Sequence, residues 1–176
     1  MNKITDTVKH LLIINGIAFL ATSLYGSQLY DLLALHYYKN PLFQIWQPLT
    51  HMFLHGNFSH ILFNMIGLWM FGSPLEQLWG RNKFIFFYLS SGLGAAALQI
   101  LYSSYDFNSI FEILVSNGFN SEEIINTIET SRYNLNWLSY ISEQQLSNLN
   151  ESYNLSMVGA SGALYGILVA FAFLFP

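Results

Sequence analysis

The chain has 176 residues, of which 53% are hydrophobic and only 9% are charged. A typical globular protein has about 25% charged residues, so this composition excludes an ordinary water-soluble domain and indicates a membrane protein. The net charge of −4, without a basic cluster, argues against a nucleic-acid partner. The lack of cysteine excludes disulfides, thiolate metal ligands and a cysteine nucleophile.

Four hydrophobic stretches are predicted to cross a membrane as helices, because each is close to the ~20 residues that span about 30 Å of hydrocarbon. The first stretch resembles a signal peptide in position, but it lacks a clear small-x-small cleavage site, and we interpret it as a retained helix. The predicted spans are Val8–Tyr25, His60–Trp79, Phe84–Tyr102 and Met157–Phe175. The sequence therefore predicts an all-α, polytopic membrane helix bundle.

The basic residues predict the orientation of these spans. Lys3 and Lys9 precede the first span, and Arg81 and Lys83 lie between the second and the third. Both places are cytoplasmic under the positive-inside rule. The acidic segment 103–156 is then outside, the N-terminus is cytoplasmic, and the fourth span enters from the outside.

Two connecting segments differ in character. Residues 26–59 are aromatic and amphipathic, and we expect part of this segment to lie in the membrane interface or against the helix bundle. Residues 103–156 are rich in Asn, Ser and Glu, which predicts an external insertion. Short amphipathic helices are expected to begin near Ser121 and Ser142. The sequence assigns no function to this insertion.

A polar pair lies inside the second predicted span, where polar side chains are costly and are candidates for function. His60 and Asn64 are four residues apart, so they share one face of a helix. Both side chains can donate hydrogen bonds and stabilise a developing oxyanion. The alternative is a polar contact that only holds helices together.

A serine lies among small residues at the start of the fourth predicted span. Ser161 lies in the sequence Gly159-Ala160-Ser161-Gly162-Ala163-Leu164-Tyr165-Gly166, which leaves its hydroxyl uncrowded, as a nucleophile requires. Taken alone, the pattern favours close helix packing over a nucleophile, with Gly162 and Gly166 as a small-xxx-small pair.

Three histidines, His51, His55 and His60, are close in sequence. A zinc site would need three or four ligands, and no cysteine or carboxylate lies nearby in the sequence to complete one. We therefore expect no metal and no cofactor. Structural roles for His51 and His55 in the first external segment are the preferred interpretation.

Three motifs, in this order, resemble the rhomboid family of intramembrane proteases. The first is the stretch from Gln47 to Met65, with the sequence QPLTHMFLHGNFSHILFNM. The second is Gly72-Ser73-Pro74-Leu75-Glu76, followed by Trp79-Gly80, and the third is Gly159-Ala160-Ser161-Gly162 with Tyr165 one turn later. The resemblance covers the chain except the external insertion and the first few residues.

The resemblance implies roles for the catalytic residues. Ser161 matches the family's nucleophile, and His60 and Asn64 match side chains that line the oxyanion hole, together with the backbone N–H of Ser161. The substrates are then transmembrane proteins within the lipid bilayer, cut near the outer face. In the family the fourth span begins deep in the protein, inside a water-filled cavity.

The resemblance also implies supporting roles. Tyr165 matches an aromatic residue that packs against the catalytic histidine ring, and Gly162 matches a small residue that lets the fourth span approach the helix carrying that histidine. Gly159 is a small residue of the same motif. Glu76 matches a carboxylate that fastens the bundle, and His55 matches a structural histidine.

The sequence departs from the family's pattern at the general base. The family uses a Ser–His dyad whose histidine lies on a sixth core helix, whereas the five histidines of this chain all precede Ser161. We therefore interpret residues 1–176 as a partial rhomboid domain that ends after the fourth helix of a six-helix core. We expect the chain alone to be inactive, and its parent to act in a bacterial inner membrane.

Two alternative functions fit the sequence less well. A non-catalytic rhomboid relative would bind transmembrane clients without cutting them, but it would have no need for Ser161, His60 and Asn64 together. A small transporter or channel would require ionisable residues inside several spans. Only Glu76 meets that requirement, close to a helix end.

Overall fold

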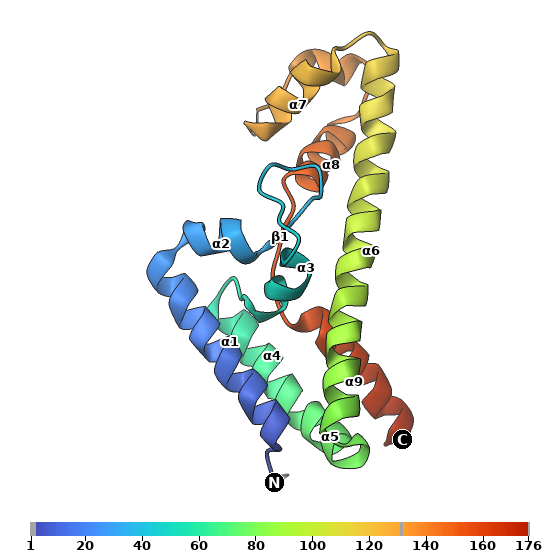
Figure 1. The fold of residues 1–176 in the computed structure, drawn as a ribbon. Coiled ribbons are helices and arrows are strands. Elements are labelled where there is room, and N and C mark those ends of the chain that lie inside the picture. The colour runs from blue at the N-terminus through green and yellow to red at the C-terminus, as the bar shows by residue number, and fades with distance from the viewer. Residues whose placement is uncertain (1–2, 131, 176) are drawn as a thin grey trace. The chain divides into compact units, whose positions relative to one another are not determined.

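The computed structural model describes residues 3–130 and 132–175, and it is predominantly helical. Figure 1 shows the order of the elements along the chain. The described residues form two compact units. The first comprises Met1–Leu35, Ile45–Ala97 and Met157–Pro176, and the second comprises His36–Gln44 and Leu98–Ser156.

The first unit contains the three motifs found in the sequence. Its elements are α1 (Asp6–Tyr25), α2 (Ser27–Leu33), α3 (Gln47–Thr50), η1 (His51–Phe53), α4 (Phe58–Gly67), η2 (Leu68–Gly72), α5 (Ser73–Trp79), the first part of α6 (Arg81–Ser116) and α9 (Ser161–Leu174). The helix α1 lies alongside α4 and α5 (Figure 1). Two-residue strands, β1 (Leu35–His36) and β2 (Ser156–Met157), pair with each other.

The core of the first unit is formed by large apolar side chains from several helices. Met52 shows how closely they pack, because its side chain fills the space that a Cβ on Gly92 of α6 would need. The buried residues of this core are Val8, Leu11, Met52, Leu68, Leu75, Phe84, Tyr88, Ala163 and Ile167. This packing holds α1, α6 and α9 around the η1 and η2 segments.

Among the described residues, α1 and α6 are long and apolar enough to cross a membrane, and α9 is a shorter apolar helix. The predicted second span, His60–Trp79, is helical along its whole length. Its middle part is the π-helical segment η2, which joins the α-helices α4 and α5. π-helical turns are rare inside helices and often occur near functional sites. None of the three pieces alone has the length of a span.

Two helices do not begin or end where the predicted spans do. The third span was expected to end at Tyr102, but α6 continues to Ser116 because no glycine or proline interrupts the pattern before Gly118, where φ is +92°. The fourth was expected to begin at Met157, but α9 begins at Ser161. Gly159 has a φ of +124°, which a helix cannot contain.

The second unit has its own apolar core, centred on buried Trp137 and Tyr153. Its helices are the later part of α6, α7 (Ser121–Glu129), η3 (Leu135–Ser139) and α8 (Glu143–Tyr153). The expected helices near Ser121 and Ser142 are confirmed. Asn120 caps α7, and Ser142 and Gln145 form a capping box on α8.

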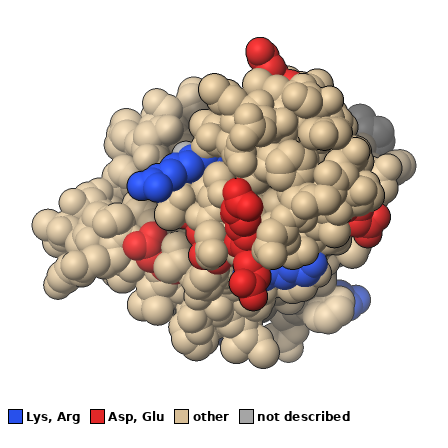
Figure 2. Space-filling view, turned by 90° about the horizontal axis from the view of Figure 1, so that it is seen from above, with Lys and Arg blue, Asp and Glu red and all other residues tan. Residues whose placement is uncertain are grey.

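The surface carries few charges. In Figure 2 the acidic and basic side chains lie singly or in small groups on a face that is mostly uncharged. This agrees with the 9% charged residues of the sequence.

Two side-chain hydrogen bonds join α3 and the residue before it to the end of α2. Trp46 Nε1 donates to the carbonyl of Leu32, and Thr50 Oγ1 donates to the carbonyl of Leu33.

Candidate active site

The backbone turn before α9 brings Ser161 and His60 together. The N–H of Gly159 donates to the carbonyl of His51 over 2.9 Å, which fixes the turn against η1. A Cβ placed on Gly159 would lie 2.7 Å from Nε2 of His60 and 3.5 Å from Oγ of Ser161. The His60 ring, the Gly159 backbone and the Ser161 hydroxyl therefore share one small space, which only glycine at position 159 permits.

Helix α4 presents His60 and Asn64 on one face. The side chain of Asn57 caps this helix by accepting a hydrogen bond of 2.8 Å from the backbone N–H of His60. Asn64 follows one turn later and is only 6% exposed. Its Nδ2 has no hydrogen-bond acceptor among the described residues. A buried donor without an acceptor costs free energy, so Asn64 is suited to bind an incoming oxygen.

Ser161 and Asn64 line the same cavity. Its volume is about 160 Å³, and its lining residues are Phe63, Asn64, Ser161, Leu164, Tyr165 and Leu168. The cavity is thus apolar apart from the serine hydroxyl, the asparagine amide and the tyrosine hydroxyl. Electrostatic interactions are stronger in such surroundings than in water. His60 does not line this cavity. Its ring lies instead against the backbone of Gly159.

Two further histidines, in the segment between α2 and α4, support this arrangement. The ring of His55 is completely buried and meets the ring of His60 edge-on, with centroids 5.0 Å apart. Burial, and the neighbouring His60 ring, lower the pKa of His55 to about 4. The backbone carbonyl of His55 accepts a hydrogen bond of 2.6 Å from the hydroxyl of Tyr30 on α2. His55 is therefore a neutral packing group behind His60.

His51 is buried as well, and burial lowers its pKa. Its Nδ1 lies 3.0 Å from the carbonyl of Gln47 in the preceding turn. Among the residues that the structure describes, no three His, Asp or Glu side chains gather as metal ligands.

Small residues bring α9 close to α6. A Cβ on Gly162 would lie 2.5 Å from the Cβ of Ala95, and one on Gly166 would overlap the side chain of Ser91. The close approach at Gly162 is therefore to α6. The expected approach was to a later helix that carries a histidine. Both helices present small residues four positions apart, which is the small-xxx-small pattern considered for this segment.

Glu76 fastens the start of α1. Its carboxylate accepts hydrogen bonds from the backbone N–H groups of Thr7 and Val8, each 3.1 Å long, and from the hydroxyl of Thr5. The first N–H groups of a helix have no partner within the helix. The helix cap residue Thr5 makes no such bond to its own helix, so Glu76 supplies the cap from α5.

Tyr165 lies one turn after Ser161 and is 70% exposed at the edge of the cavity. Its expected partner, a catalytic histidine ring, has no counterpart in this sequence after position 60.

The sequence motifs do not single out Asn57, Tyr30 or the carbonyl of His51, which also build the site. Only Asn57 has a sequence signal, because an asparagine directly before an apolar run is a typical helix start.

Comparison of the sequence with known proteins identifies its family. The profile of the Rhomboid domain matches residues 42–176, and the chain belongs to the rhomboid family, a family of intramembrane serine proteases.

Among its relatives, the chain is 32% identical to "Rhomboid protease GluP" of Bacillus subtilis over 60 residues, which are 34% of this chain and 12% of that protein. It is also 32% identical to "Rhomboid protease GlpG" of Yersinia pestis over 78 residues, 44% of this chain and 28% of that protein. The chain thus matches less than a third of the length of either relative.

Proposed function

We propose that this chain carries the nucleophile and the oxyanion-binding groups of an intramembrane serine endopeptidase. The observation that carries the proposal is that Ser161 and Asn64, far apart in the sequence, line one cavity. The amide of Asn64 is buried there without an acceptor. Membership of the rhomboid family supports the same chemistry.

In the proposed mechanism, Oγ of Ser161 attacks the carbonyl carbon of a peptide bond in an unwound part of a transmembrane substrate, near the outer face. The hydroxyl proton passes to a general base, since a neutral serine is a weak nucleophile. The carbonyl oxygen becomes an oxyanion that Asn64 Nδ2, the His60 ring and the N–H of Ser161 bind. The amine product leaves, and water hydrolyses the acyl-enzyme.

The general base is a histidine that these 176 residues do not supply. All five histidines precede Ser161. His60 contacts the Gly159 turn, which suits an oxyanion donor, and His55 is buried behind it. The matched relatives are much longer than the stretches they share with this chain, which leaves room for such a residue in a rhomboid protein. We accordingly expect no proteolysis by this chain alone.

We propose four spans of a six-helix core, with the N-terminus in the cytoplasm of a bacterium and the α4–η2–α5 run as the second span. Residues 103–156 are then an external insertion. The helix α9 begins only at Ser161, after a non-helical turn at Gly159. A nucleophile at the start of a span that follows such a turn supports cleavage near the outer face.

The proposal is tested by cleavage of a model transmembrane substrate in vesicles. Three proteins are compared: the 176-residue chain, the chain extended by two helices with a histidine, and the extended chain with Ser161→Ala. We expect product only from the extended chain with Ser161 intact. Cleavage by the unextended chain that disappears with Ser161→Ala would show that the base lies within these residues and would contradict the assignment.

A second candidate is a rhomboid protein that binds transmembrane clients without cutting them. Crosslinking of the substrate to both the extended chain and its Ser161→Ala variant, without any product from either, would support this function instead.

A further inference from the structure

A cavity away from Ser161 lies where α5 turns into α6. Its volume is about 480 Å³, and its lining residues are Trp79, Asn82, Lys83, Phe86 and Phe87. This volume is in the range of ligand sites. Gly80, with a φ of +77°, makes the tight turn that sets the last residue of α5 against the first two turns of α6.

The cavity has an aromatic wall. Trp79 and Phe87 meet edge-on, with ring centroids 5.0 Å apart. Phe86 is 75% exposed on the adjoining face of α6, which is one of the two helices long and apolar enough to span a membrane. Tryptophan is enriched where a membrane helix meets the head-group layer, because its ring is apolar and its N–H is polar. The wall therefore has the composition of a surface that faces lipid.

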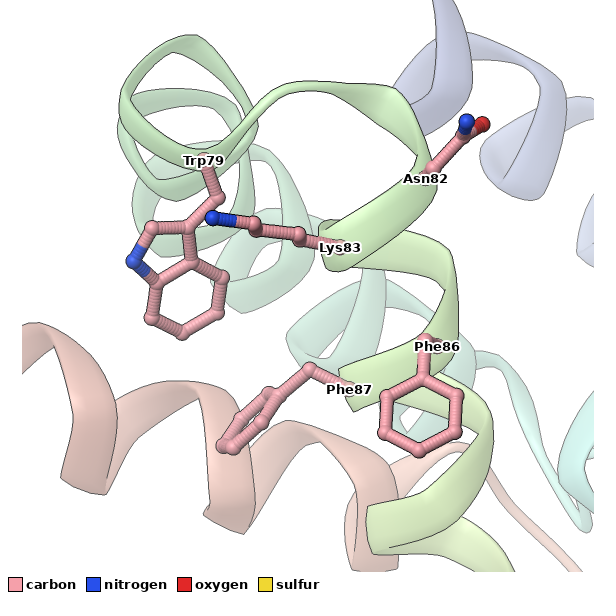
Figure 3. A pocket seen from close by; sticks show the side chains of 5 residues that line it. All are labelled: Trp79, Asn82, Lys83, Phe86 and Phe87. Atoms are coloured by element: carbon pink, nitrogen blue, oxygen red, sulfur yellow. The ribbon is translucent and has the colours of Figure 1, made fainter.

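Lys83 adds a positive charge to this wall. Figure 3 shows its side chain extending from the first turn of α6 toward Trp79, with the ring of Phe87 below both in that view, while Asn82 points away from them. Within residues 3–130 and 132–175, Lys83 forms no salt bridge with an acidic side chain. Arg81 lies two residues earlier, and α6 has no acidic residue in its first turn. The positive charge is therefore not balanced locally.

From the unbalanced charge of Lys83 above an apolar aromatic wall, we propose that this cavity binds one anionic phospholipid. Its phosphate pairs with Lys83, and its acyl chains lie along Phe86 and Phe87. Basic pockets at the ends of membrane helices bind anionic head groups in this way. A soluble anion would gain the charge contact but would leave the exposed apolar face uncovered. The cavity does not include Ser161, so the proposal of lipid binding is independent of the proposed proteolytic function.

The test measures lipid binding by native mass spectrometry of the purified chain in neutral detergent. Phosphatidylglycerol and phosphatidylcholine of the same chain length are titrated separately. We expect one phosphatidylglycerol to bind more tightly than phosphatidylcholine. Lys83→Gln should weaken phosphatidylglycerol binding about fivefold. One lysine near an anionic lipid surface contributes about 1 kcal/mol, which corresponds to that change in Kd. Phosphatidylcholine binding should stay unchanged.

Matched variants separate a site from general attraction. Lys83→Arg should bind as the original chain does, and Lys9→Gln, which removes an exposed lysine that does not line the cavity, should have no effect. Phe86→Ala should weaken binding of the lipid, while sn-glycerol 3-phosphate should not displace it. Equal losses with Lys83→Gln and Lys9→Gln, or displacement by glycerol phosphate, would overturn the proposal. The helical circular dichroism of each variant checks that the fold is kept.

Discussion

The amide of Asn64 is the most informative single group of the site. It is buried, it has no acceptor among the described residues, and it opens into the cavity of Ser161. Such an unpaired donor is suited to an acceptor that arrives with a substrate. Because an oxyanion forms only during the reaction, such a donor acts on the transition state more than on substrate binding.

Asn64→Ala is therefore expected to lower kcat about 10²–10³-fold and to leave KM nearly unchanged. The measurement is steady-state cleavage of a transmembrane substrate by the extended chain. Asn126→Ala, an exposed asparagine of α7, is the matched control and should be neutral. A rise in KM at constant kcat would mean that Asn64 holds the ground state and would contradict an oxyanion role.

His55 provides a prediction on pH. Its ordinary pKa is 6.5, and in the folded chain burial lowers it to about 4. Between these values the unfolded chain binds a proton that the folded chain does not. The free energy of unfolding is then greatest above pH 6.5 and falls as the pH drops toward 4. His51, with a pKa also lowered by burial, contributes in the same direction.

The pH dependence is measured by unfolding in sodium dodecyl sulfate titrations between pH 7.5 and pH 4.5. His55→Gln should flatten part of the slope. His10→Gln, at an exposed position of α1, should leave it unchanged. A slope that is the same with and without His55 would show that this ring does not carry the effect.

At the residue scale, helical spacing and small neighbours single out Ser161, His60 and Asn64 in the sequence. The structure brings Ser161 and Asn64 to one cavity, and the catalytic roles of all three residues stay predictions. The link from the Gly159 N–H to the carbonyl of His51 joins two backbone groups. Backbone groups are the same in every residue, so no pattern of side chains could predict that bond.

At the scale of elements, Glu76 joins α5 to the start of α1. The carboxylate accepts from two backbone N–H groups that would otherwise have no partner. Glu76→Ala should lower the free energy of unfolding by about 1–3 kcal/mol, the usual effect of leaving buried donors unpaired. Glu76→Gln retains one acceptor oxygen and should cost less. The measurement is the same detergent titration, and equal losses for both variants would contradict the capping role.

The contact between α6 and α9 provides a matched pair of glycines. Gly162→Ala places a Cβ 2.5 Å from that of Ala95, whereas a Cβ on Gly94 meets nothing within 4 Å. Gly162→Ala should therefore destabilise the fold by about 1–3 kcal/mol. Gly94→Ala should be neutral or slightly stabilising, because alanine favours a helix over glycine. Similar stability of the two variants would show that the helices are not in close contact.

Element boundaries were predicted less well than element identity. The hydrophobic runs identified the apolar helices, yet α6 extends to Ser116 and α9 begins only at Ser161. A hydropathy pattern predicts the apolar length that crosses a membrane. A helix can extend beyond that length until a residue interrupts its backbone. In α6 the polar residues after Tyr102 alternate with Phe107, Ile110 and Leu114, which are buried in the second unit. The helix thus continues with a different partner.

At the scale of the whole molecule, the two units have separate cores. The sequence indicated an external insertion with two short helices, and α7 and α8 have the expected starts. It did not indicate that residues 36–44 belong to the same unit, because that contact joins distant parts of the chain. The catalytic proposal depends only on the first unit, where all three motifs occur.

The identity of the nucleophile is the central claim, and mapping the site of a covalent adduct tests it most directly. The extended chain, with its two added helices and histidine, is treated with a fluorophosphonate, digested and analysed by mass spectrometry. We expect one adduct, on Ser161, and none after Ser161→Ala. An adduct on another serine, or labelling that persists in the Ser161→Ala variant, would contradict the assignment.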